Sequence, residues 1–164
     1  MTATPCSASA AVCSSFTIGT VNQICGRVDF RQCHEPTLSH KRSCQEWPTS
    51  VCVSFFRAWR KPVLLTEAVV TEATHLLGRV PGGPLAVLRF VLDRGAVLVP
   101  CSERAVARAE LQMRRYADLP LDYADATLVV LAEDVATPHI LTLDRRDFAV
   151  LRWRERRTFQ IHPQ

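Results

Sequence analysis

The sequence predicts an α/β fold in which helices cover both faces of a central parallel sheet. Short apolar runs at 63–65, 96–99 and 140–141 have the length of buried strands. Longer segments with helical periodicity separate these runs. Strands that alternate with helices form parallel sheets, because each helix returns the chain to the edge where the previous strand began.

Composition limits the class of protein. The chain has 164 residues, of which 48% are hydrophobic and 22% are charged, as in an ordinary globular protein. The net charge of +4 is compatible with a polyanionic partner but does not require one. No apolar run approaches the roughly 18 residues of a membrane span, and the first basic residue is only Arg27. We therefore expect a cytoplasmic protein with no membrane partner.

Residues 1–50 differ from the rest of the chain. Ser, Thr, Cys and Gln are frequent there, and neither helical nor strand periodicity persists. Short strands at 16–18 and 28–30 are one interpretation, and a tail without a packed core is the other. Six of the seven cysteines lie at or before Cys52, but no CxxC pair occurs, which argues against a zinc site or a disulfide framework. We expect an irregular segment over 1–50 and one folded domain over 51–164.

In the first half of that domain, aromatic and apolar spacing predicts a helix that ends near Trp59, followed by a strand at 63–65. Thr66 is a suitable N-cap for a helix over 67–77. Pro84 begins the next helix and Gly95 ends it. The apolar residues of this last helix recur at helical spacing, at Leu85, Leu88 and Leu92.

In the second half, a strand at 96–99 precedes a helix that Ser102 caps and that runs to about residue 117. Its inward face is expected to hold Val106, Ala109, Met113 and Tyr116. A helix over 122–134 is apolar on all sides and so should be buried. The remaining elements are a strand around 140–143, a short helix at 147–152 and an edge strand at 158–161.

Two aspartates are expected to meet at one end of the sheet. Asp122 is a good N-cap, which places Asp125 at the third helical position, where a capping-box partner lies. Asp144 follows the strand around 140–143 at its carboxyl end. Sites in open α/β sheets form beyond the carboxyl ends of strands, close to helix N-termini. Asp125 and Asp144 can therefore share a pocket.

Other carboxylates extend this set. Glu72 lies about one and a half turns into its helix and can point toward Asp125 and Asp144, or be a solvated surface residue. Asp147 either assists the site or caps the short helix. Clustered carboxylates repel one another unless a cation joins them, and Mg²⁺ prefers such oxygen ligands. The cluster itself therefore favours a metal ion.

At these residues the chain resembles the PIN-domain ribonucleases, and among them the VapC toxins of bacterial toxin-antitoxin pairs. The resemblance covers roughly 51–164, and its order of motifs is more specific than any one of them. The matching segments are 65–73 (LTEAVVTEA), 116–120 (YADLP), 125–126 (DA), 132–133 (AE) and 142–148 (TLDRRDF).

The resemblance implies a three-layer α/β/α domain and an endoribonuclease that uses Mg²⁺, with Mn²⁺ as a substitute. Glu72, Asp125 and Asp144 would hold the metal, and Asp147 would assist. The resemblance also implies an RNA substrate, a cognate antitoxin and a homodimer. The basic residues beside the pocket could contact the RNA backbone, or simply be solvated; they include Arg145, Arg146 and Arg152.

The amino end departs from the family. PIN ribonucleases carry a further Asp at the end of their first strand, in an Asp-Thr or Asp-Ser step. No such step exists here, and Asp29 is the only Asp before Asp93. We expect the first strand to be missing or irregular, and we hypothesise that residues 1–50 are disordered or read out of frame. Read from the third base of the Pro36 codon, the codons for 36–38 can encode Asp-Thr.

The departure leaves a second function open. A PIN-like domain that lacks one of its carboxylates would have a weaker metal site, since the remaining ligands cannot complete the same coordination shell. Such a domain would bind RNA or a partner protein without cleaving. A degenerate fragment that folds poorly is a third interpretation.

Overall fold

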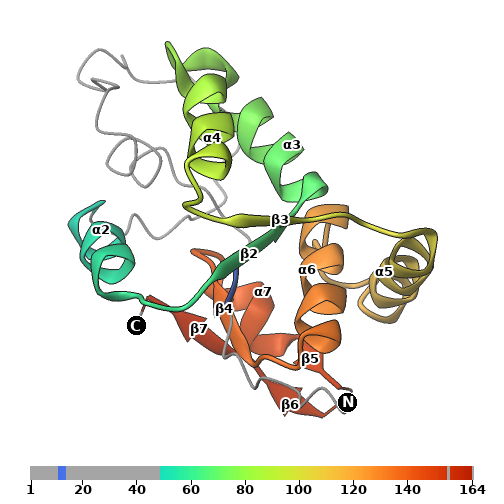
Figure 1. The fold of residues 1–164 in the computed structure, drawn as a ribbon. Coiled ribbons are helices and arrows are strands. Elements are labelled where there is room, and N and C mark those ends of the chain that lie inside the picture. Colours follow the sequence, from blue (N-terminus) through green and yellow to red (C-terminus); the bar gives the residue numbers. More distant parts are fainter. Residues whose placement is uncertain (1–10, 14–48, 155, 164) are drawn as a thin grey trace, which may run out of the picture.

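Five parallel strands form the central sheet of the computed structural model, which describes residues 11–13, 49–154 and 156–163. Their spatial order is β3-β2-β1-β4-β7 (Figure 1). The strands are β1 (Ala11–Cys13), β2 (Val63–Thr66), β3 (Val97–Val99), β4 (His139–Leu141) and β7 (Gln160–His162). The parallel α/β sheet that the alternation of elements predicts is confirmed, and β7 is the edge strand expected near 158–161.

The central strand corrects one expectation. A first strand is present, although it has only three residues, and Val12 pairs with Leu64 on one side and with Ile140 on the other. Ala11–Cys13 did not stand out in the sequence, because three residues carry no periodicity. The strands that we considered at 16–18 and 28–30 lie outside the described residues. A piece of the irregular segment 1–50 is thus part of the sheet.

In the part of the chain that the structure describes, seven helical segments flank these strands, and a two-stranded antiparallel ribbon follows α7. The helices are α2 (Thr49–Ala58), α3 (Glu67–Leu76), the 3₁₀ segment η2 (Leu77–Arg79), α4 (Gly83–Leu92), α5 (Glu103–Arg115), α6 (Tyr123–Asp134) and α7 (Arg145–Val150). The ribbon consists of β5 (Arg152–Trp153) and β6 (Arg157–Thr158), which the sequence did not predict. Every helix expected from periodicity in this region is present, with ends shifted by a few residues.

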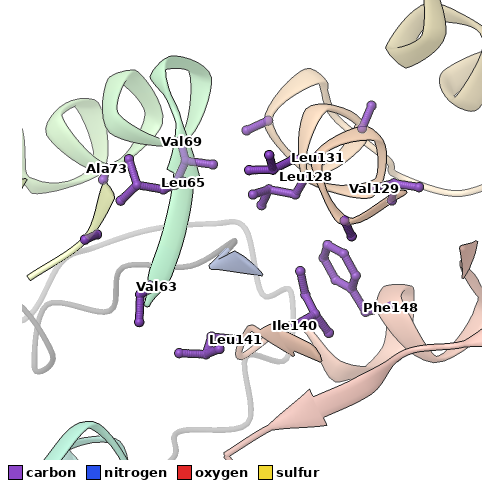
Figure 2. Close-up of a cluster of buried hydrophobic side chains, with 14 of the residues drawn as sticks. Val63, Leu65, Val69, Ala73, Leu128, Val129, Leu131, Ile140, Leu141 and Phe148 are labelled. Atoms are coloured by element: carbon purple, nitrogen blue, oxygen red, sulfur yellow. The ribbon is translucent and has the colours of Figure 1, made fainter. Parts of the chain in front are cut away.

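Helix α6 lies at the centre of the core. Its residues from Ala126 to Ala132 are all buried, as expected for a helix that is apolar on every side. Figure 2 shows Leu128 and Leu131 facing Leu65 of β2 and Val69 of α3. This packing fixes the position of α6 against β2 and against α3, the helix that contains Glu72.

Helix α2 covers the opposite face of the sheet from α6. Neighbouring strand residues point to opposite faces, so that His139 and Ile140 face different layers. His139 contacts Trp59, just after α2, whereas Ile140 belongs to the core with Leu128 (Figure 2). Phe55 of α2 stacks on His162 of β7 at a centroid distance of 5.3 Å. The sheet is therefore enclosed on both sides, as a three-layer α/β/α arrangement requires.

Helix α4 presents its leucines to solvent. Leu85, Leu88 and Leu92, the stripe that helical spacing selected, are 68%, 44% and 72% exposed. The buried residues are instead Ala86, Val87 and Phe90, which occupy the adjacent face. Periodicity identified an apolar stripe correctly, but it does not reveal whether the same chain covers it.

Helix α5 packs along α6, and ion pairs from Arg108 also join the two helices. Ala109 is fully buried as expected, whereas Val106 is 43% exposed, so the expected inward position of Val106 is wrong. Arg108 reaches across to Glu133 at 2.7 Å and also to Asp134. None of the helices that the structure describes combines the length and the apolar character that a membrane crossing needs.

Candidate metal site

The N-terminus of α6 is capped by Asp122. The Asp122 carboxylate accepts a hydrogen bond from the backbone N–H of Asp125 at 2.9 Å, so Asp125 is the third helical residue, as the sequence predicts. The cap stops the chain in an extended conformation at Asp122 and starts the helix at Tyr123. The Asp125 side chain remains available for chemistry because its backbone, and not its carboxylate, satisfies the cap.

The N-terminus of α7 repeats the same arrangement. Asp144 caps this helix and accepts a hydrogen bond from the backbone N–H of Asp147 at 3.3 Å. The backbone N–H of Asp144 in turn donates to the hydroxyl of buried Thr142 at 2.9 Å. Two Asp-x-x-Asp caps therefore begin two helices, and each presents carboxylates beside the positive end of its helix dipole.

Glu72 comes from a third element. It is the sixth residue of α3 and is partly buried. Burial raises the pKa of its carboxyl group, and the negative charge of Asp122 raises it further. Glu72 and the α6 cap thus lie close enough to influence each other, although 50 residues separate Glu72 from Asp122.

The carboxylates converge on Asp125. Burial is the largest cause that raises the pKa of Asp125 to about 8, and the charges of Asp122, Glu72, Asp144 and Asp147 add to it in that order. A carboxyl group in this setting is held partly neutral at physiological pH because a further negative charge is unfavourable there. The charges that raise this pKa are all negative, and a bound cation would offset them.

The carboxylate side chains of the described residues do not form a cluster of three that surrounds one position for a metal ion. In the described part of the chain, no three Asp, Glu, His or Cys side chains are arranged closely enough to hold one ion together. The carboxylates are near enough to raise the pKa of Asp125, although no three of them form such a cluster. Their chemistry nevertheless fits a hard divalent cation, which takes oxygen ligands and retains several waters.

The arginines selected from the sequence have different surroundings. Arg145 donates to the carbonyl of Pro163 at 3.1 Å. One guanidinium nitrogen of Arg152 donates to the carbonyls of Ala149, Val150 and Leu151, at the end of α7. Arg146 is exposed. Arg152 thus has a structural role at a helix C-terminus, whatever its further contacts.

Trp153 and Tyr123, the two aromatic residues near the ends of α6 and α7, differ in how far they are exposed to solvent. Trp153 is 4% exposed and belongs to the core, whereas Tyr123 is 41% exposed at the first position of α6. The Tyr123 hydroxyl donates to the thiol of Cys101 at 3.7 Å. Only Tyr123 of the two can offer an open ring face beside the carboxylates.

Comparison with known proteins places this fold in a family. The sequence matches no protein-family model. It is, however, 36% identical to ribonuclease VapC26 of Mycobacterium tuberculosis over 92 residues, which are 55% of this chain and 68% of VapC26. The chain belongs to the VapC-like PIN-domain ribonuclease family. The resemblance inferred from the motifs is confirmed.

A solved VapC structure shares the fold of this VapC-like chain. The crystal structure of VapC20 from M. tuberculosis, described as a sarcin-ricin loop cleaving toxin, superposes with a TM-score of 0.53. The sequences are 14% identical, and the superposition covers 80% of this chain and 87% of VapC20. At this identity the likeness concerns the fold alone.

Sequence reasoning missed a buried polar contact between the elements that carry Glu72 and Asp125 in this VapC-like chain. Thr66 is the N-cap of α3 by position, but its side chain makes no capping hydrogen bond, contrary to our expectation. Its hydroxyl lies 2.8 Å from that of Thr127 in α6, and both residues are buried. No local pattern signals this pair because its members are 61 residues apart.

Proposed function

We propose that this chain is a metal-dependent endoribonuclease and the toxin of a toxin-antitoxin pair. The observation that supports this most is the convergence of Glu72, Asp144 and Asp147 on Asp125, whose pKa is raised to about 8. Membership of the VapC-like family supports the reaction class, since VapC26 is a ribonuclease. The domain that carries the activity is 51–164, completed by β1.

Glu72, Asp125 and Asp144 hold Mg²⁺ in this proposal, and Mn²⁺ can replace it. When bound, the metal polarises the phosphate and lowers the pKa of an attacking water. Asp122 and Asp144 orient the two helix N-termini through their caps, which places Asp125 and Asp147 beside the substrate. Asp147 positions the water.

The substrate backbone lies toward the arginines in this proposal. Arg145 and Arg146 follow Asp144 directly and add positive charge beside the carboxylates, which a phosphodiester chain requires. Arg152 acts from the far end of α7 and contributes to the field in addition to its capping contacts. The phosphate contacts make binding dependent on salt concentration.

One observation favours a second function, RNA or protein binding without cleavage. No Asp or Glu follows β1 in the sequence until Asp29, so the central strand brings no carboxylate directly to the end of the sheet where Asp144 lies. Three carboxylates retain a weaker metal site than four, and activity falls with metal occupancy.

An RNA cleavage assay separates the two functions. The full chain is incubated with a structured RNA in Mg²⁺, in Mn²⁺ and in EDTA, beside the Asp125→Asn and Asp118→Asn variants. We expect cleavage with either metal, none in EDTA and none with Asp125→Asn, while Asp118→Asn, an exposed site, behaves as wild type. RNA binding without cleavage under all conditions would support the second function.

The partners follow from the same proposal. A cognate antitoxin neutralises the enzyme, and two copies of the chain form a homodimer. The exposed leucine stripe of α4, formed by Leu85, Leu88 and Leu92, supports a protein partner at that surface. We assign it to the second copy, because spacings of three and four residues form the seam of paired helices.

A further inference from the structure

A buried pair of hydroxyl groups connects the two elements that carry Glu72 and Asp125. Thr66 ends β2 and begins α3, and Thr127 lies two residues after Asp125 in α6. Their side-chain oxygens are 2.8 Å apart, and the residues are 3% and 2% exposed. The contact therefore spans the interface between the metal-site elements at its buried base.

The direction of this hydrogen bond follows from its neighbours. The Thr127 hydroxyl donates to the carbonyl of Ala124 at 2.7 Å, so its only proton is used. Thr66 must then be the donor in the pair, with Thr127 the acceptor. Because the Thr66 side chain makes no capping bond to α3, this contact accounts for its orientation.

The surrounding contacts are not directional. Leu65 and Val69 pack against Leu128 and Leu131, as Figure 2 shows, and such apolar surfaces tolerate small relative shifts. A hydrogen bond restricts both distance and angle. Ligands of a metal ion need placement to within about 0.5 Å, which directional contacts supply better than apolar packing.

We propose that the Thr66–Thr127 hydrogen bond positions Glu72 relative to Asp125, so that both carboxylates can reach the same divalent ion. Thr66 and Thr127 are positioning residues, since neither contacts the metal or the RNA. The inference rests on the proposed metal site and adds the contact that fixes the relative position of its two carboxylates.

Paired substitutions separate positioning from simple stability. Thr127→Val removes the acceptor of the buried Thr66 hydroxyl and should lower the unfolding midpoint, whereas Thr66→Val leaves the Thr127 hydroxyl bonded to Ala124 and should lower it less. The double valine variant should regain most of this loss, because two methyl groups of the same shape then face each other. The double serine variant keeps both hydroxyls but loses two methyl groups, so it should be less stable than wild type.

The two double variants should rank in the opposite order for metal affinity: the less stable double serine variant should bind metal more tightly than the double valine variant. Binding of Mn²⁺ to the full chain is measured by electron paramagnetic resonance, with unfolding measured in parallel. We expect the double valine variant to be stable yet to bind Mn²⁺ about tenfold more weakly. The double serine variant should bind as wild type does despite its lower stability. Thr137→Val is the matched control, because Thr137 is buried and its hydroxyl accepts from His139 N, at the start of β4.

Two outcomes overturn the inference in distinguishable ways. If the double valine variant binds Mn²⁺ as tightly as wild type, the hydroxyl pair only satisfies buried polar groups, and the metal site stands without it. If the wild-type chain binds no Mn²⁺, the proposed metal site itself fails, and the positioning role fails with it.

Discussion

Asp125 is the residue on which the chemistry of this protein depends. Burial and the negative charges of Asp122, Glu72, Asp144 and Asp147 together raise the pKa of its carboxyl group to about 8. An aspartate with a structural role is usually stabilised by a nearby Lys or Arg side chain. The groups whose charges shift the pKa of Asp125 are instead all acidic. Unfavourable charge that persists in a folded protein is typical of a functional site.

Replacing this residue should separate stability from activity. At neutral pH the folded chain holds most of the Asp125 carboxyl protonated, at a free-energy cost that Asp125→Asn removes. The metal-free variant should therefore be more stable by about 1 kcal/mol, or roughly 2–4 °C. RNA cleavage should fall on the order of 100-fold or more, because a metal ligand is lost. Thermal unfolding and the cleavage assay measure the two effects. Lower stability with cleavage unchanged would contradict the role of Asp125.

A pair of histidines gives the fold a pH dependence away from the metal site. Nδ1 of His139 and Nε2 of His162 lie 3.1 Å apart beneath Trp59 and Phe55. Burial, followed by the charge of Lys61, lowers the pKa of His139. Burial, followed by the charges of His139 and Lys61, lowers the pKa of His162. The folded protein therefore favours neutral imidazoles.

The sign of the effect follows from these directions. Folded-state pKa values below the usual 6.5 stabilise the protein above that pH, and the contribution is lost as the pH falls through the lowered values. The histidine pair should thus lower the unfolding midpoint by a few degrees below about pH 6.5, against the opposite contribution of Asp125, whose pKa is raised. His162→Gln should flatten this dependence, while His75→Gln, at an exposed site, should not. An equal slope in His162→Gln would exclude the pair as its source.

At the scale of elements, sequence patterns located the helices and strands of the described region but not their surroundings. The apolar run of α6 predicted burial correctly, because a helix with no polar face has no other stable position. The stripe on α4 is apolar on one face, and the same pattern serves a core or an interface between chains. The Asp122 cap was readable since capping is local, but the cap considered at Asp147 is wrong, because α7 begins earlier and Asp144 caps it. The contact between Thr66 and Thr127 depends on the fold and has no local signal.

The α4 stripe should be the contact between two copies of the chain. Leu88→Glu or Leu92→Glu places a charge in the seam, so the protein should shift from dimer to monomer, with thermal stability little changed because both leucines are exposed in the single chain. Light scattering after size exclusion measures the mass. Arg104→Glu is the control, because Arg104 is exposed on a different helix, α5. A wild-type chain that is monomeric at high concentration would contradict this assignment.

For the whole molecule, the open question is the origin of residues 1–50. The sheet is complete with β1, yet the sequence after this strand holds no carboxylate until Asp29, and the composition changes near Val51. The position of β1 could not be predicted from three residues, since it is fixed by pairing with β2 and β4. The hypothesis that this segment is read out of frame remains a prediction.

The encoding DNA tests that hypothesis. An alternative frame upstream of the Val51 codon should encode an alternating apolar strand that contains an Asp-Thr or Asp-Ser step. A chain translated in that frame should bind Mn²⁺ and cleave RNA on the order of tenfold better or more, because a fourth carboxylate completes the site. If no frame encodes such a step, the hypothesis is wrong and the amino end is genuinely divergent.

The most direct measurement is the position of a divalent ion in crystals grown with Mn²⁺, located by its anomalous scattering. The account predicts one strong peak within about 2.3 Å of carboxylate oxygens from Glu72, Asp125 and Asp144. A peak bound only by other residues, or none in a crystal soaked at millimolar Mn²⁺, would contradict it.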